Sequence, residues 1–509
     1  MQLMLLHDKP QYQGDGSGHE EIQEETPPGS NALGANKYLP CSILGGDSLG
    51  GFAFPQDVRG RRKVGIAHVP SLSISIAESR LSANRGATWY NLFFRMRAFL
   101  KQQRFGQPQF LAALLLLIFV GQCAWLIRSD LHSGRLSREE QFILRRGLEQ
   151  WRGNKSGASV PGQFSFDGEA AWTDWFTDSI GQQVLERNHS RLYYLVSSAP
   201  LLLWPAQFEN RWFVLWGWLA RAAGLFFGLC LAASLWYVAR RLYGNAGGYI
   251  ALLLFCFSPG LIRTSAGWFT ESETAAAWGA FGAIFTAVAV AHTLYAPREV
   301  VLWNWRRIVL LGVALALAIG SQFLLIVLVA LVPALLFYLA PNRIKAGLAI
   351  WVAASSIALL VLLASYFFSL SRFWSDIHNR LSWTIAETSF CMPGAYRRLL
   401  TELIDSCPVL LLAMPAALLV FFLWRRTRYF GNGAPLLVGV ALLTLALLLP
   451  HGPGVAFPLI ALPFLFLFVA GMCADVLETR YRRLVLPALA GVLAAYALRT
   501  LLEVARVRI

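Results

Sequence analysis

Long uninterrupted apolar runs dominate the sequence from residue 110 onward. The first, 110–127, reads FLAALLLLIFVGQCAWLI, and further runs follow it at intervals through residue 502. A helix of about 20 apolar residues crosses the hydrocarbon core of a bilayer and satisfies its own backbone hydrogen bonds. A soluble domain cannot cover so much apolar surface, because 56% of the 509 residues are hydrophobic and only 14% are charged. We therefore expect an all-α polytopic membrane protein with about eleven transmembrane helices.

Basic clusters between the apolar runs predict how the chain is oriented. Arg240 and Arg241 follow one run, and Arg306 and Arg307 precede another. Such clusters lie on the cytoplasmic face, and every strongly basic cluster between predicted spans falls on the same side of this topology. Orientation therefore explains the net charge of +15, and we expect no nucleic-acid partner. The prediction is a multi-pass cell-membrane protein of the bacterial inner-membrane type with a cytoplasmic N-terminus.

The first 95 residues differ in composition from the rest of the chain. They are rich in Gly, Ser, Pro, Glu and Asp and lack a sustained apolar periodicity, so we expect a disordered polar tail without a secretory signal peptide. The predicted organisation is a tail (1–95), a basic segment with the first span (96–127), a first outer loop (128–220), a bundle core (221–368), a second outer loop (369–407) and C-terminal spans (408–509).

The two predicted outer loops are too long to be simple turns. The first contains RLYYLVSSAPLLLW, whose apolar part is shorter than the roughly 20 residues that a span needs, so we expect an interfacial helix there. The second loop contains Cys391 and Cys407. The sequence is compatible with a disulfide between them or with two unpaired thiols, because sequence separation does not fix the distance between their Cβ atoms.

Three acidic residues lie near the predicted membrane surface on the outer side. Glu139 and Glu140 stand at the head of an amphipathic segment in the first loop, and Glu271 stands in the short loop before the span 274–294. Acids so close to hydrocarbon are costly unless they face a wet cavity or a partner, which makes them candidates for function. A structural alternative remains, since acids in the first turn of a helix also interact favourably with its dipole.

Four motifs in this order resemble those of the GT-C superfold glycosyltransferases, in the branch of protein O-mannosyltransferases and lipid A aminoarabinose transferases. The segment SREEQFILRRGLEQWRG is similar to the family's acidic motif, with Glu in place of Asp, and HSRLYY from His189 is similar to its H-P-P-L-Y-Y element without the prolines. The segment from Arg221 to ARRLYG resembles the second span of that family. Thr270-Glu271 resembles its T-D pair, and the resemblance covers about residues 105–300.

This resemblance implies a GT-C-type bundle that moves a sugar from a polyprenyl-phosphate donor to a lipid, glycan or protein acceptor on the outer face, with inversion. It implies that Glu139 is the general base, that Glu140 orients the acceptor or a cation, and that Glu271 supports the base or helps to hold a divalent metal ion. No metal ligand set is defined by the sequence. The implied substrate-binding residues are His189, Tyr193, Arg221, Arg263, Arg397, Arg398 and His451. The four arginines among them would stabilise the negative charge on the departing phosphate.

A lipid-linked sugar flippase or small-molecule transporter is the alternative class. Secondary transporters are typically marked by internal repeats, broken helices and polar residues deep within spans. The apolar runs of this chain contain few charges and show no clear inverted repeat, and the first outer loop is unusually long for a transporter. The sequence therefore favours the glycosyltransferase.

Overall fold

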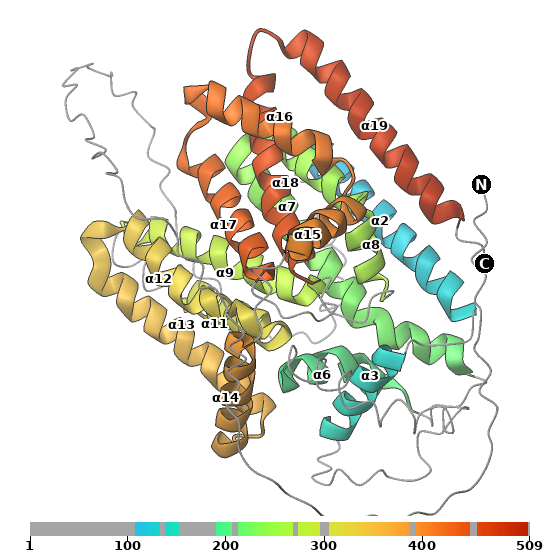
Figure 1. Cartoon of the computed structure of the whole chain (residues 1–509), viewed down its shortest axis with the longest axis vertical. Coiled ribbons are helices and arrows are strands. Elements are labelled where there is room, and N and C mark those ends of the chain that lie inside the picture. Colours follow the sequence, from blue (N-terminus) through green and yellow to red (C-terminus); the bar gives the residue numbers. More distant parts are fainter. Residues whose placement is uncertain are drawn as a thin grey trace, which may run out of the picture. The chain divides into compact units, whose positions relative to one another are not determined.

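The computed structural model describes residues 107–132, 138–151, 190–205, 212–267, 273–295, 305–386, 393–447 and 456–506. Every regular element within these ranges is a helix, which confirms the predicted all-α class (Figure 1). The predicted tail 1–95 lies outside the described residues. The elements are α2 Gln107–His132, α3 Arg138–Trp151, α6 Arg191–Ser198, η1 Ala199–Leu203, α7 Phe213–Cys256, α8 Pro259–Ser265, α9 Glu273–Thr293, α11 Trp305–Ser321, η3 Phe323–Val327, α12 Leu328–Leu339, η4 Pro341–Arg343, α13 Ile344–Ser365, α14 Leu370–Ala386, α15 Pro393–Ser406, α16 Leu410–Leu423, η5 Arg425–Thr427, α17 Phe430–Ala446, α18 Ala456–Leu477 and α19 Arg482–Arg506.

The predicted apolar runs coincide with helices of the structure, and the chain is a multi-pass membrane protein. In the described part of the chain, six helices are long and apolar enough to cross a bilayer, and a seventh span results if α15 and α16, bent by 103°, are counted as one. The expected number of about eleven counts shorter apolar helices such as α12 and α17 separately, and counts α7 twice.

Helix α7 is broken in its second half by Gly244. Its 44 residues would extend for ~66 Å at 1.5 Å per residue, about twice the hydrocarbon core. Gly244 has φ 73° and ψ −170°, a conformation open to glycine, so the chain changes direction there. The break falls between two apolar runs of the sequence, 222–238 and 247–261, each of which predicts a span of its own.

Small side chains allow the central helices to approach one another closely. Helix α9 is rich in Ala and Gly, and a Cβ added at Gly279 would lie 2.6 Å from the backbone nitrogen of Ala318 on α11. Helix α18, which packs against α7, α9 and α17, fills the centre with the fully buried Phe464, Phe466 and Phe468. Close backbone contact of this kind gives dispersion energy to helices in lipid, where the hydrophobic effect does not drive their association.

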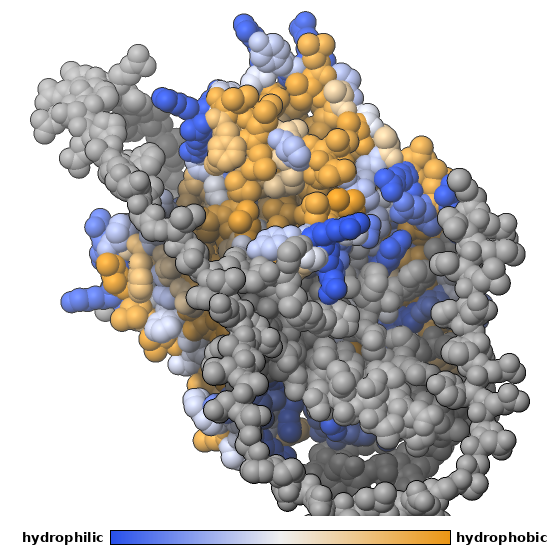
Figure 2. Space-filling view, viewed as in Figure 1, coloured by the Kyte–Doolittle hydropathy of each residue, from blue (hydrophilic) through white to orange (hydrophobic). Residues whose placement is uncertain are grey.

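The outward side chains of several helices form an apolar surface. Figure 2 shows hydrophobic residues spread over the region of α16 and its neighbours, with hydrophilic residues at the margins. Leu412, Leu423 and Leu437 are among the most exposed, at 71%, 76% and 64%. A soluble protein rarely exposes so many large apolar side chains together, so lipid is the solvent of this surface.

Two short helical segments lie within the second half of the predicted first outer loop. RLYYLVSSAPLLL folds as α6 followed by η1, which confirms the predicted helix, and its last residues Leu202 and Leu203 are half to mostly exposed. Its position at the membrane interface stays a prediction. The hydroxyl of Ser190 caps α6 at the backbone nitrogen of Leu192 and also donates to the carbonyl of Gly320, which fixes α6 to the end of α11.

Candidate functional site

Arg221 is a buried arginine on the third turn of α7. Its side chain is 1% exposed, and it forms a fork with Glu140 of α3: Nε donates to Oε1 at 3.0 Å and Nη2 donates to Oε2 at 3.2 Å. Nη2 also donates to Oδ2 of Asp130 on α2. A buried guanidinium is tolerated only with compensating charge and hydrogen bonds. Two parallel hydrogen bonds between an arginine and a carboxylate are stronger than hydrogen bonds between neutral groups. One side chain therefore ties together three helices.

Asp130 is a member of this cluster that the sequence analysis did not identify. It lies in the last turn of α2, three residues beyond the end of the predicted first span. Its side chain is 31% exposed, whereas that of Glu140 is 11% exposed. A signal was available, because a lone acid at the end of an apolar run is expensive unless it has a partner or a function. Asp130 is the more accessible of the two carboxylates.

One nitrogen of Arg221 is left over after these bonds. Nη1 is buried and has no hydrogen-bond partner among the described residues. A buried donor without a partner costs about 1–3 kcal/mol, so it is a position where a further acceptor is favourable.

Gly267 lies against the side chain of Arg221. A Cβ at this position would stand 3.0 Å from Cγ, 3.2 Å from Cδ and 3.3 Å from Nε of Arg221, and the φ of Gly267 is +79°. Both the contact and the backbone conformation favour glycine here. Gly267 is also the last described residue before Glu271, whose own placement lies outside the described residues.

Helix α3 is held in place by close contact with α6. A Cβ at Gly147 would lie 2.2 Å from both the hydroxyl of Ser198 and the carbonyl oxygen of Tyr194. Trp151 donates from Nε1 to the carbonyl of Leu195 at 3.0 Å. Contact at this distance fixes the axis of α3 and therefore positions Glu140.

The predicted substrate residue Tyr193 lies within this same contact. It is 4% exposed and belongs to a buried cluster with Phe142, Ile143 and Tyr194. The structure therefore places Tyr193 in the packing between α3 and α6.

The other predicted site residues are distributed as follows. Glu140 and Arg221 are in direct contact, and Arg263 is half-buried in the last turn of α8. Arg397 and Arg398 are exposed on α15, which packs against α8 and α18. In the described part of the chain, none of these three arginines forms a hydrogen bond or ion pair with Asp130, Glu140 or Arg221. His189, Glu271, His451 and the side chain of Glu139 lie outside the described residues.

A divalent metal ion does not fit the part of this site that the structure describes. Both oxygens of Glu140 and one of Asp130 accept hydrogen bonds from Arg221, whereas Mg²⁺ or Ca²⁺ needs several uncommitted oxygen ligands. Among the described residues there is no group of three or more His, Cys, Asp or Glu side chains that could hold a metal ion.

The fold and this cluster together define an all-helical multi-pass membrane protein with a buried carboxylate–arginine cluster where α2, α3 and α7 meet. Solved structures similar to the chain include two of an oligosaccharyltransferase from Archaeoglobus fulgidus. The complex with Zn and sulfate has a TM-score of 0.40 and 14% identity, covering 62% of this chain and 44% of that one. The complex of AglB with an inhibitory peptide and a dolichol-phosphate has a TM-score of 0.41 and 15% identity, covering 63% and 48%.

The archaeal oligosaccharyltransferase is a glycosyltransferase of the GT-C fold. The chain spans less than half the length of either of them. At these TM-scores the likeness is a loose one in the arrangement of helices. No protein-family model and no curated protein sequence matches the chain.

Proposed function

We propose that the chain is a membrane glycosyltransferase that takes a sugar from a polyprenyl-phosphate donor at the outer face of the membrane. The observation that supports this most is the buried fork between Arg221 and Glu140, with Asp130 beside it, where α2, α3 and α7 meet. A lipid-linked donor holds its anomeric carbon near the interface, so the reacting groups must stand at the ends of spans. This cluster is built there.

In the proposed reaction Asp130 is the general base. Of the two carboxylates it is the more exposed, so an acceptor hydroxyl reaches it more easily than it reaches Glu140. The acceptor oxygen attacks the anomeric carbon and forms the new C–O bond while the bond from that carbon to the phosphate oxygen breaks. The electron pair leaves with the phosphate, the hydroxyl proton passes to Asp130, and the configuration inverts. The role of general base that the resemblance implies for Glu139 stays an alternative prediction, since the side chain of Glu139 lies outside the described residues.

Glu140 and Arg221 position this base in the proposal. Glu140 holds the guanidinium through two bonds, and the guanidinium in turn holds Asp130. Nη1 of Arg221 supplies a donor for a substrate oxygen, and Arg263, Arg397 and Arg398 are the further cations for the departing phosphate. Side chains held this way keep the reacting atoms within the narrow range of distances and orientations that a fast reaction requires.

Reconstituted protein with radiolabelled polyprenyl-phosphate sugars tests this function. Wild type is expected to release polyprenyl phosphate and to label an acceptor in a membrane extract, and Asp130→Asn is expected to lower the transfer rate by about 100-fold or more, as loss of a general base does. The matched control is Glu149→Gln, whose carboxylate lies on α3 but pairs with Arg145 at 3.1 Å.

Equal transfer rates for Asp130→Asn and wild type would remove Asp130 from the reaction. Movement of the intact donor across the bilayer, without cleavage of its sugar–phosphate bond, would support the flippase alternative instead.

A further inference from the structure

A cavity of about 480 Å³ lies between α7, α9 and α11, away from the carboxylate–arginine cluster. Tyr237, which lines it, stands 16 positions after Arg221 on α7, or ~24 Å along the helix axis. The cavity therefore belongs to the opposite end of the first arm of α7. Its size is in the range of pockets that bind small molecules or single lipid chains.

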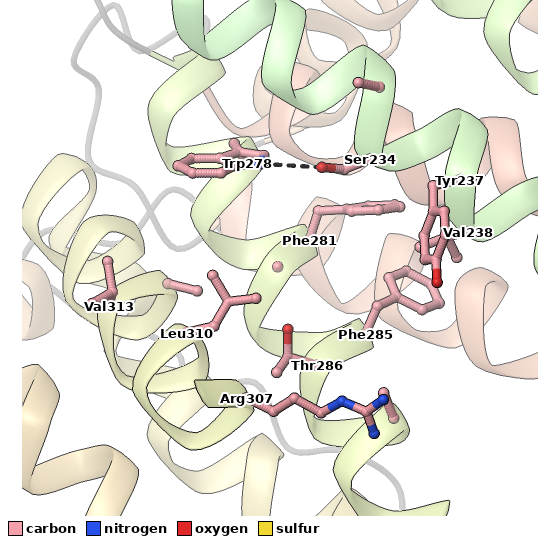
Figure 3. A pocket seen from close by; sticks show the side chains of 14 residues that line it. Ser234, Tyr237, Val238, Trp278, Phe281, Phe285, Thr286, Arg307, Leu310 and Val313 are labelled. Carbon is pink, nitrogen blue, oxygen red and sulfur yellow. Dashed lines mark hydrogen bonds between the residues drawn. The ribbon is translucent and has the colours of Figure 1, made fainter. Parts of the chain in front are cut away.

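The walls of this cavity are almost entirely apolar. Figure 3 shows Phe281 and Phe285 of α9 extending toward Tyr237 and Val238 of α7, whereas Leu310 and Val313 of α11 lie on the other side of α9. The indole of Trp278 closes one end, and its Nε1 donates to the hydroxyl of Ser234 at 3.2 Å, which satisfies the only donor of the indole.

The cavity is formed before any ligand arrives. Phe281 and Phe285 pack with their ring centroids 4.6 Å apart, and Phe464 of α18 stacks behind Phe285 at 6.0 Å. Phe281 is 1% exposed. Because α18 supports the aromatic wall from behind, an occupant does not have to open it.

A single cation stands at the other end of the cavity. Arg307 lines it, is exposed, and makes no hydrogen bond or ion pair with the residues that the structure describes (Figure 3). Two aromatic–basic pairs lie close in sequence to the lining residues Val238 and Arg307: Arg240 stacks on Trp236 at 5.2 Å and Arg306 on Trp305 at 5.7 Å. Such residues gather where a membrane protein meets the lipid headgroups.

The length of the cavity matches one leaflet of a bilayer. Its lining on α9 runs from Trp278 to Ala289, eleven positions or ~16 Å of helix, and half of the ~30 Å hydrocarbon core is ~15 Å. A chain that starts at the headgroup level beside Arg307 therefore ends near Trp278.

From this geometry we propose that the cavity binds an anionic phospholipid of the leaflet on the basic side of the protein. One acyl chain lies along α9 between α7 and α11, and the phosphate pairs with Arg307. The lipid contacts α7, α9 and α11 at the end of the bundle opposite to the carboxylate–arginine cluster.

The test uses the full-length protein, purified and delipidated in detergent, with phosphatidylglycerol added. Thermal unfolding should shift upward in wild type, and native mass spectrometry should show one retained phosphatidylglycerol. Arg307→Gln is expected to weaken this retention by about fivefold, the usual effect of one basic residue near an anionic headgroup. The matched control, Arg306→Gln, removes the neighbouring exposed arginine that does not line the cavity and is expected to bind as wild type does.

Two further measurements distinguish the occupant. Ala289→Phe, which fills the exposed edge of the cavity, should abolish retention even with Arg307 intact, and inorganic phosphate should give no thermal shift. The proposal is overturned if Arg307→Gln and Arg306→Gln behave alike, if inorganic phosphate stabilises as much as the lipid, or if polyprenyl phosphate displaces phosphatidylglycerol at equal concentration.

Discussion

Arg221 of α7 donates two hydrogen bonds, of 3.0 Å and 3.2 Å, to the carboxylate of Glu140 on α3, which lies 81 positions away in the sequence. The bond pair joins the first predicted outer loop to the membrane bundle. It also places Asp130 at the same guanidinium, so the geometry of the proposed base depends on a contact between two elements that no local sequence signal connects.

Glu140→Gln should destabilise the protein by about 3 kcal/mol. The substitution leaves a guanidinium that is 1% exposed without its main counter-charge, and breaking a buried ion pair from one side costs about 3–5 kcal/mol. Equilibrium unfolding in mixed micelles measures the change. Glu149→Gln on the same helix should change stability by less than about 0.5 kcal/mol, since its partners Arg145 and Arg146 are partly exposed. Similar losses for the two variants would show that the fork is not a structural tie.

Gly267→Ala should lower transferase activity by about 10- to 100-fold. The new methyl group would press on the side chain of Arg221 at 3.0–3.3 Å and displace it, and small displacements at a reacting centre carry costs of this size. The initial rate of sugar transfer measures the effect.

Gly244→Ala separates this effect from backbone strain. Gly244 also has a positive φ, 73°, but a Cβ there would meet nothing within 4 Å. Both variants carry about 1–3 kcal/mol of backbone strain, but only Gly267→Ala should slow the reaction. Equal rates for the two variants would contradict a role of Arg221 in positioning the substrate or the base.

Gly147→Ala should separate α3 from α6 and cost about 2 kcal/mol of stability. Its Cβ would overlap the hydroxyl of Ser198 and the carbonyl of Tyr194 at 2.2 Å, so one helix has to move. Faster cleavage of the first outer loop in limited proteolysis reports the separation. Gly121→Ala on α2 is the control, because a Cβ there has open space, and it should gain about 0.5–1 kcal/mol from helix propensity. A neutral Gly147→Ala would mean that α3 is not held by this contact.

The membrane fold could be predicted from the sequence because its signals are local. Each apolar run predicts one helix from its own residues. Even the break at Gly244 falls in the polar segment between two apolar runs. Basic clusters supply orientation in the same local way. Runs of twelve to seventeen residues, such as α12 and α17, are the ambiguous cases, because length alone does not decide whether they cross the bilayer.

The candidate site could be predicted only in part, because its geometry depends on long-range contacts. The motif around Glu139 and Glu140 marks the right helix, but neighbouring residues on a helix point about 100° apart, and the spacing does not say which one faces Arg221. Asp130 was missed because it looks like an ordinary polar residue after a span, and its partner is 91 positions away. Tyr193 resembles a family motif residue, whereas its surroundings on α3 are apolar.

Cys407 should be a free thiol that reagents reach only after unfolding. It is 0% exposed and unpaired in the structure, where its Sγ lies 3.2 Å from the hydroxyl of Tyr496 on α19. The structure thus favours the unpaired alternative for this cysteine, and Cys391 lies outside the described residues. Native protein treated with a maleimide should leave Cys407 unlabelled with or without reductant, and denaturation in SDS without reductant should label it fully.

The order in which reductant and denaturant act decides between the two states of Cys407. A buried thiol needs only denaturant, because its lack of reactivity is due to exclusion of the reagent, whereas a disulfide also needs a reductant. Mass spectrometry of the labelled peptide, with Cys407→Ser to confirm its assignment, measures this directly. If labelling of Cys407 requires both denaturant and reductant, Cys407 is in a disulfide. That result would also mean that the junction of α15 and α16 is held covalently rather than by the packing of Cys407 beneath Tyr496.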